Sequence, residues 1–236
     1  MVAVAIFSLL PSASKVSAQA ETHPDFSGFW QLRYDNINVP LPKLTAKAKS
    51  ADMKAMAAND LHVVRFCNHV GMPALMDRSS VLDIRESARE VSILPEAVSP
   101  VRHIYTDGRP VADVNIVDPT TVGYSVGRWV GDTLVVDTRD FDTHGLLEIP
   151  GGGYRTADSH LLESYRLVEN GANLEVTFTW TDPGVFAEPH TYSYRYARMG
   201  QDYRAVEWYC DPGDNNRAHF LIDAPKPVVW PDGAKQ

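Results

Sequence analysis

The sequence predicts a mainly β protein, an antiparallel meander that closes into a barrel of about 8–10 strands, with one helix near the N-terminus. Short runs rich in β-branched and aromatic residues follow one another through most of the chain, and turn residues separate them. After the N-terminal part, no helical pattern lies between these runs. A long meander protects its edge strands most simply by closing on itself, and a barrel of about eight strands is wide enough to enclose one small ligand.

The clearest hairpin pattern lies at residues 122–141, VGYSVGRWVGDTLVVDTRDF. Because the β-branched Val130 resists positive φ, we expect a three-residue loop that ends at Gly131, with a bulge beside it. In that register Asp137 lies opposite Gly123, on a face of small and polar residues. The residues of the apolar face then pair as follows: Arg128 with Asp132, Val126 with Leu134, and Tyr124 with Val136.

The other elements follow from the same patterns. Residues 25–34 alternate well enough for a first strand, and residues 44–64 form a helix, because Thr45 can cap it and apolar residues recur at helical spacing. Residues 66–78 show no period and are expected to form an irregular loop. Gly151-Gly152-Gly153 predicts a flexible segment suited to a lid. Further strands are expected at residues 81–86, 89–94, 101–106, 159–168, 173–181, 190–199 and 203–210.

The chain of 236 residues fits one domain, and nothing in it marks a linker. Residues 1–20 have the pattern of a secretory signal peptide, with an apolar run at residues 2–10 and the small-x-small sequence Ala18-Gln19-Ala20. No Lys or Arg precedes the apolar run, so an uncleaved hydrophobic N-terminus is the alternative. We expect residues 21–236 to form a single barrel domain in a periplasmic or secreted protein.

The net charge restricts the classes of partner, and the cysteine content bears on disulfide formation. The net charge of -8, without a cluster of Lys and Arg, argues against a nucleic-acid or anionic-membrane surface. Beyond the N-terminus no stretch approaches the ~18 apolar residues of a membrane span. Cys67 and Cys210 are the only cysteines, and in an oxidising compartment they most simply form one disulfide. A catalytic thiol is the alternative, although neither cysteine lies in a known nucleophile motif.

Four segments carry a resemblance to known proteins: PDFSGFW at residues 24–30, RHIYTDGRP at 102–110, GYSVGRWVGDTLVVDT at 123–138 and EWYC at 207–210. Together they resemble a family of exported bacterial proteins of largely unknown function, marked by a GRWxGDTLVVDT hairpin. The resemblance implies a periplasmic β-barrel, lipocalin-like in outline, and it supplies no reaction or ligand. His103, Tyr124 and His144 depart from the residues associated with these motifs.

Motifs for common enzyme chemistry are missing from the sequence. Gly123 to Gly127 matches G-x-S-x-G, but Ser125 lies inside a predicted strand, whereas a nucleophile elbow needs a strand, a sharp turn and a helix. No His-x-His or His-x3-His pair occurs among the eight histidines, so we predict no metal site, and we predict no cofactor.

Ionisable residues on the predicted strands remain as candidates for chemistry. Inside a barrel, His or a carboxylate can abstract a proton while Tyr or Arg stabilises the developing oxyanion. The predicted catalytic residues are His103 or His160 as the base, Tyr105 and Arg102 as oxyanion or hydroxyl contacts, and Asp137 or Glu163 as the orienting carboxylate. Each also has a plainer interpretation as an exposed or structural residue; Glu163, for example, would form a surface pair with Arg166.

Aromatic residues supply the predicted substrate contacts, which are Tyr124, Trp180, Tyr192, Tyr194 and His144. Tyr192 and Tyr194 are two residues apart and share one face of a strand, which suits an aromatic ligand, although a packed core explains the pattern equally well.

Three functions fit these residues. The first is a cofactor-independent lyase or isomerase that performs acid–base chemistry on a small hydrophobic or aromatic molecule in a barrel pocket. The second is a non-catalytic carrier of a similar ligand. The third is an exported structural protein whose barrel is filled by its own side chains.

Overall fold

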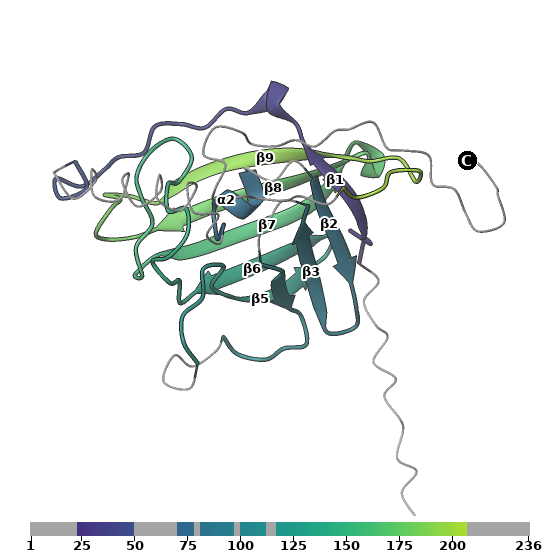
Figure 1. The fold of residues 1–236 in the computed structure, drawn as a ribbon, viewed down its shortest axis with the longest axis horizontal. Helices are drawn as coiled ribbons and strands as arrows, with labels where there is room; N and C mark the ends of the chain where they lie inside the picture. The colour runs from purple at the N-terminus through teal and green to yellow at the C-terminus, as the bar shows by residue number, and fades with distance from the viewer. Residues whose placement is uncertain (1–22, 50–69, 78–80, 97–99, 112–116, 207–236) are drawn as a thin grey trace, which may run out of the picture.

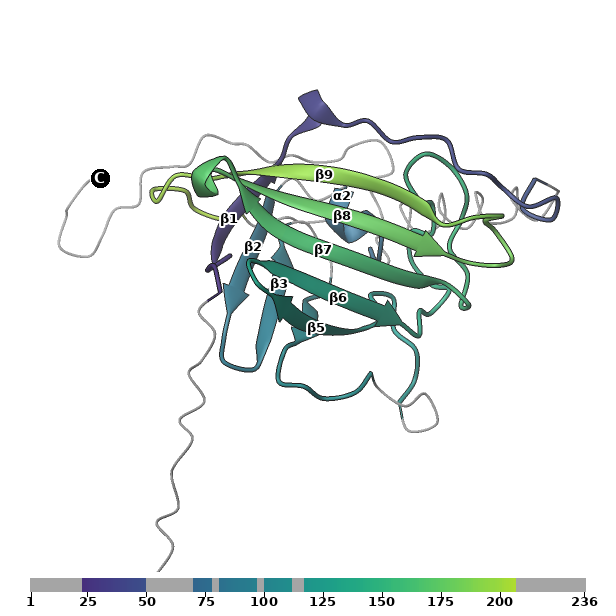
Figure 2. The ribbon, with the colours of Figure 1, turned by 180° about the vertical axis from the view of Figure 1, so that it is seen from behind.

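The structure is a computed structural model that describes residues 23–49, 70–77, 81–96, 100–111 and 117–206. Within these residues nine strands form one closed barrel in which each strand pairs with the next along the chain and the last pairs with the first (Figure 1). The strands are β1 (Gly28–Leu32), β2 (Val81–Glu86), β3 (Glu90–Pro95), β4 (Arg102–Tyr105), β5 (Tyr124–Val130), β6 (Thr133–Arg139), β7 (His160–Val168), β8 (Asn173–Thr181) and β9 (His190–Arg198). The predicted mainly β barrel is therefore confirmed. Figures 1 and 2 show strands β5 to β9 running side by side while β1 to β3 cross them at an angle.

One seam of the barrel departs from the expected antiparallel order. A closed ring with an odd number of strands cannot be antiparallel at every seam, and here β4 and β5 run parallel. Their register joins only Ile104 to Ser125 and Tyr105 to Val126, whereas β7 and β8 pair along their full lengths. The long connection from β4 to β5 makes this parallel pairing possible, because parallel neighbours need a crossover.

The register of the β5–β6 hairpin differs from the prediction. The loop consists of Gly131 and Asp132 alone, since Val130 pairs with Thr133 across it. Gly131 has φ +61° and Asp132 has no positive φ, which is the φ pattern of a type II′ turn. Val130 stays in the strand, so its resistance to positive φ does not lengthen the loop.

This shift moves Asp137 to the outside of the barrel. Asp137 pairs with Val126 instead of Gly123, and its side chain is 30% exposed on the outer face. Ser125 pairs with Thr138, and both side chains face the interior. The predicted pocket that combined Asp137 with small residues of β5 is therefore wrong, and so is the predicted pairing of Arg128 with Asp132.

The predicted cap at Thr45 is present, whereas part of the predicted loop at residues 66–78 is helical. Ala48 N donates to Thr45 Oγ1 at 3.2 Å, so Thr45 caps a first turn as predicted, while residues 50–64 lie outside the described part of the chain. Part of the expected loop at residues 66–78 is instead a short buried helix, α2 (Ala74–Asp77). Burial of its apolar side chains, rather than a periodic pattern, stabilises it. One-turn 3-10 helices, η1 (Tyr34–Asn36) and η2 (Glu169–Gly171), flank the sheet.

Several features predicted near the two ends of the chain lie partly or wholly outside the described residues. Residues 203–206 form no strand, so the described half of the expected last strand at 203–210 is wrong. The Tyr203 hydroxyl and the backbone N–H of Val206 both donate to the Glu96 carboxylate there. Cys67, Cys210 and residues 1–20 lie outside the described residues, and the disulfide and the signal peptide stay predictions. No helix of the described part is long and apolar enough to cross a bilayer.

Candidate functional site

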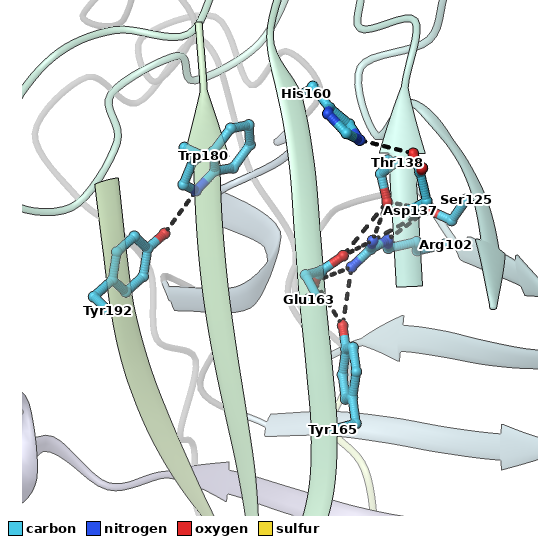
Figure 3. A network of polar contacts seen from close by, with 9 residues as sticks. All are labelled: Arg102, Ser125, Asp137, Thr138, His160, Glu163, Tyr165, Trp180 and Tyr192. Atoms are coloured by element: carbon cyan, nitrogen blue, oxygen red, sulfur yellow. Dashed lines mark hydrogen bonds and ion pairs between the residues drawn. The ribbon is translucent and has the colours of Figure 1, made fainter. Parts of the chain in front are cut away.

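A buried ion pair joins β4 to β7 inside the barrel (Figure 3). The guanidinium of Arg102 donates to both carboxylate oxygens of Glu163 on β7, at 2.8 Å from Nη1 to Oε1 and with a second contact from Nη2 to Oε2. Neither side chain is exposed to solvent. Tyr165, two residues along β7, accepts from Arg102 Nη1 at 3.1 Å and donates to Glu163 Oε1 at 2.8 Å.

Two hydroxyl groups complete this network. Arg102 Nη2 donates to Thr138 Oγ1 at 2.9 Å, and Arg102 Nε donates to Ser125 Oγ at 3.3 Å. Ser125 and Thr138 also bond each other at 2.9 Å. An arginine has five N–H groups, and here each of them finds an acceptor. The network therefore ties β4 to β5, β6 and β7 where backbone pairing is shortest.

Burial and the charges within the network determine the protonation states of Arg102 and Tyr165. Burial acts to lower the pKa of Arg102, but attraction to the Glu163 carboxylate outweighs it and raises that pKa. Burial and the same carboxylate raise the pKa of Tyr165 well above its ordinary value. Arg102 therefore stays charged and Tyr165 stays protonated at physiological pH, so these groups are suited to holding strands together and unsuited to transferring protons.

Two of the predicted residues, Asp137 and His160, form a second pair on the outer surface. His160 Nε2 lies 2.9 Å from Asp137 Oδ1, and Arg139 donates to the same carboxylate from Nε and Nη2, both at 3.0 Å. Burial tends to raise the pKa of Asp137, but hydrogen bonding from Arg139 and the nearby His160 lower it overall. Because these residues project from the outer faces of β6 and β7, they cannot contact a ligand inside the barrel.

The remaining two predicted residues, His103 and Tyr105, lie together on the outer face of β4. His103 Nδ1 is 3.1 Å from Glu90 Oε1, and its ring stacks on Tyr105 with centroids 6.2 Å apart. Arg109 packs on the ring of Tyr105, with its guanidinium carbon 3.9 Å from the ring centroid. Arg102 and His103 are adjacent in sequence and so point to opposite faces of the strand. The six predicted catalytic residues thus form three separate pairs instead of one site.

An aromatic wall lines the interior faces of β8 and β9, and we use this name for Phe178, Trp180, His190, Tyr192 and Tyr194. The Tyr192 ring lies 5.1 Å from Phe178, 5.3 Å from Tyr194 and 5.4 Å from His190, measured between centroids. Trp180 Nε1 donates to the Tyr192 hydroxyl at 3.1 Å (Figure 3). All five side chains are at most 4% exposed.

The wall contains three of the five predicted substrate contacts, Trp180, Tyr192 and Tyr194. The other two lie outside: the Tyr124 hydroxyl donates to Asp118 O at 2.9 Å on the surface, and the His144 side chain is 85% exposed beside Asp142. Sequence reasoning omitted Phe178 and His190 from the site. Their spacing of two residues from Trp180 and Tyr192 is the signal that places them on the same faces.

The predicted lid segment packs at one end of the wall. His190 Nε2 lies 2.8 Å from Pro150 O. Gly151, Gly152 and Gly153 follow with φ of +91°, +118° and +93°, values that L side chains rarely adopt. A Cβ on Gly151 would lie 2.5 Å from Pro40 O, so this turn passes close to the N-terminal segment and closes against it.

The described residues show two shallow hollows, and both include outer-face residues of the barrel. One is lined by residues 191–193 and Arg195 of β9, Tyr192 among them, beside Asn38, and the other involves Arg89, Glu90 and Arg109. Within the same residues, no group of three or more His, Cys, Asp or Glu side chains is arranged to hold a metal ion. The aromatic wall itself is packed within the hydrophobic core of the barrel.

No protein-family model matches the chain, and no curated protein matches it. Among solved structures, the fluorescent protein UnaG in its N57A mutant form matches at 15% sequence identity and a TM-score of 0.35, over 75% of this chain and 97% of that one. The class of protein, a closed nine-stranded β-barrel with an aromatic wall, rests on the strand pairing of the described residues.

Proposed function

We propose that this protein is a non-catalytic carrier of a small hydrophobic or aromatic molecule, held against the aromatic wall. The observation that supports this proposal is the run of inward-facing rings on two neighbouring strands, with Phe178 and Tyr192 stacked at an interplanar angle of 20°. Small-molecule sites are lined mostly by apolar and aromatic groups, with a few polar groups that orient the ligand. The wall has this composition.

A lyase or isomerase acting in the barrel is the less favoured proposal. Such an enzyme needs a base within hydrogen-bonding reach of its substrate. His103 and His160, the predicted bases, lie on the outer surface, and the buried carboxylate of Glu163 is held by Arg102. Nε2 of His190, the histidine of the wall, is bound to Pro150 O. The buried phenol groups have raised pKa values because of burial and are poor bases at neutral pH.

Ligand entry would take place beside the lid segment. The contact between His190 and Pro150 O is a polar link between the wall and the turn that covers it. Movement of the turn at Gly151 to Gly153 would expose His190 and then Tyr192, its neighbour in the wall. The consecutive glycines lower the barrier to such movement, because glycine tolerates the backbone changes it needs.

Fluorescence titration with N-phenyl-1-naphthylamine tests the proposal. We expect the folded protein to bind this neutral aromatic probe and to enhance its emission, with energy transfer from Trp180. Tyr194→Leu, which removes one ring of the wall, should weaken binding, while Tyr124→Leu on the outer face should leave it unchanged. Absence of probe binding by the folded protein, or equal weakening by both variants, contradicts the proposal.

We also propose that the carrier acts outside the cytoplasm, because an apolar run and Ala18-Gln19-Ala20 begin the sequence. Expression of the full chain in a Gram-negative host, followed by osmotic release, should yield a protein shortened to begin near Glu21. Recovery of full-length protein from the cytoplasm alone would contradict export and leave the ligand proposal in place.

A further inference from the structure

The Tyr192 hydroxyl has a proton that no described group accepts. Indole Nε1 is only a donor, so the contact of 3.1 Å from Trp180 uses the Tyr192 oxygen as an acceptor and leaves the phenolic proton unused. No other polar contact of Tyr192 occurs among the described residues. The side chain is 4% exposed, so water has little access to it. A buried donor without an acceptor costs free energy that a suitable ligand would recover.

Two other buried tyrosines show that this arrangement is unusual within the barrel. Tyr165 donates to Glu163 at 2.8 Å, and Tyr196 donates to Met76 O at 2.7 Å. Both hydroxyl protons are therefore used inside the protein. Tyr192 differs because its described partner is itself a donor, and accepting that hydrogen bond polarises the hydroxyl and makes it a stronger donor.

The surroundings of Tyr192 favour a neutral acceptor. Burial disfavours a negative charge on the Tyr192 oxygen, and the neighbouring Tyr194 disfavours it further, so the pKa of Tyr192 is raised. The hydroxyl lies among buried aromatic side chains, where an unpaired charge on a ligand would be costly. Arg102, a buried cation of the barrel interior, is already fully bonded to Glu163 and its neighbours.

We infer that Tyr192 is the orienting hydrogen-bond donor of the aromatic wall, and that the ligand is a neutral, flat aromatic molecule carrying a carbonyl oxygen. This inference rests on the proposed carrier function. Stacking against the rings of Phe178 and Tyr194 would hold the flat part of the ligand, and the Tyr192 proton would select the carbonyl. Aromatic ketones, aldehydes, esters and amides all belong to this class.

A matched pair of fluorescent probes tests the inference. One is 6-propionyl-2-dimethylaminonaphthalene, and the other is 2-dimethylaminonaphthalene, which lacks the carbonyl. We expect the wild-type protein to prefer the ketone, and Tyr192→Phe to weaken ketone binding about tenfold while leaving the second probe unaffected. Tyr105→Phe is the control, because the Tyr105 ring lies on the outer face and its loss of a hydroxyl should change neither affinity.

The outcomes separate the inference from the function on which it rests. If the wild-type protein binds neither probe, the carrier proposal fails and the inference fails with it. If both probes bind and Tyr192→Phe keeps the preference for the ketone, the inference is overturned while the carrier proposal stands. Should Tyr192→Phe fail to fold, the infrared carbonyl stretch of the ketone bound to wild-type protein decides: a shift to lower frequency than in hexane supports the hydrogen bond, and no shift overturns it.

Discussion

The guanidinium of Arg102 contacts both carboxylate oxygens of Glu163, and neither side chain is exposed to solvent. The pair joins β4 to β7 across two intervening strands, beside the parallel seam where β4 and β5 share only two backbone register pairs. Long-range side-chain bonding thus strengthens the part of the barrel where the backbone ladder is shortest.

Removal of one member of this pair should be costly. Glu163→Leu leaves the Arg102 guanidinium buried and uncompensated, so we expect a loss of about 3–5 kcal/mol in the free energy of unfolding, measured by urea denaturation. The double variant Arg102→Leu with Glu163→Leu should lose less, because no charge is left unpaired. Arg166→Leu is the control, since its pair with Glu175 is exposed and should contribute less than about 1 kcal/mol. Equal losses for Glu163→Leu and Arg166→Leu would contradict this account.

Stability should depend on the ionisation of Asp137. Its pKa in the folded protein lies below the ordinary value of 3.8, so the folded state favours the charged form. The stabilisation is present at neutral pH and is lost as the pH falls through the folded-state pKa, below about pH 4. Asp137→Asn should therefore be less stable at neutral pH and should lose less stability on acidification than the wild-type protein.

Urea midpoints measured at neutral and acid pH check the prediction for Asp137. The control is Asp132→Asn, at an exposed loop carboxylate that bonds the neighbouring Thr133 hydroxyl. Parallel pH profiles for the wild-type protein and Asp137→Asn would show that the contacts of Asp137 with Arg139 and His160 do not stabilise the fold.

The outer histidines should not affect ligand binding. His103→Ala and His160→Ala remove side chains from the outer faces of β4 and β7, so we expect the affinity for N-phenyl-1-naphthylamine to stay within the error of the titration. Tyr194→Leu provides the comparison in which binding weakens. Loss of binding in a folded His160→Ala variant would place the site on the outer face, beside Asp137.

The hairpin loop should tolerate substitution at one of its two positions. Gly131 has φ +61° and open space where a Cβ would lie, so Gly131→Ala adds backbone strain without a clash. We expect a loss of about 1–3 kcal/mol, the usual cost of a sparsely populated backbone conformation in an L residue. Asp132→Ala, at the position without positive φ, should change the free energy of unfolding by less than about 0.5 kcal/mol. Similar losses at both positions, measured by urea denaturation, would argue against this turn geometry.

Most strand positions could be predicted from local patterns alone. The expected strands at residues 81–86 and 173–181 match β2 and β8 at both ends, and the strand at 190–199 exceeds β9 by one residue. Alternation also placed Trp180 on one face of β8 and placed Tyr192 with Tyr194 on one face of β9, and both faces are interior. These results follow because the side chains of a strand alternate with a period of two, which is readable from sequence.

Which face turns inward, and which strands meet, depended on the tertiary structure. The predicted three-residue loop gave the β5–β6 hairpin one register, whereas the observed two-residue loop pairs Val126 with Asp137 and puts the carboxylate outside. Arg102 and Glu163 come from strands that are not adjacent, and only closure of the barrel brings them together. The sequence by itself determined the strands and their alternation, because both are local. The tertiary structure alone decided the seam, the buried ion pair and the composition of the wall, because these depend on contacts between distant segments.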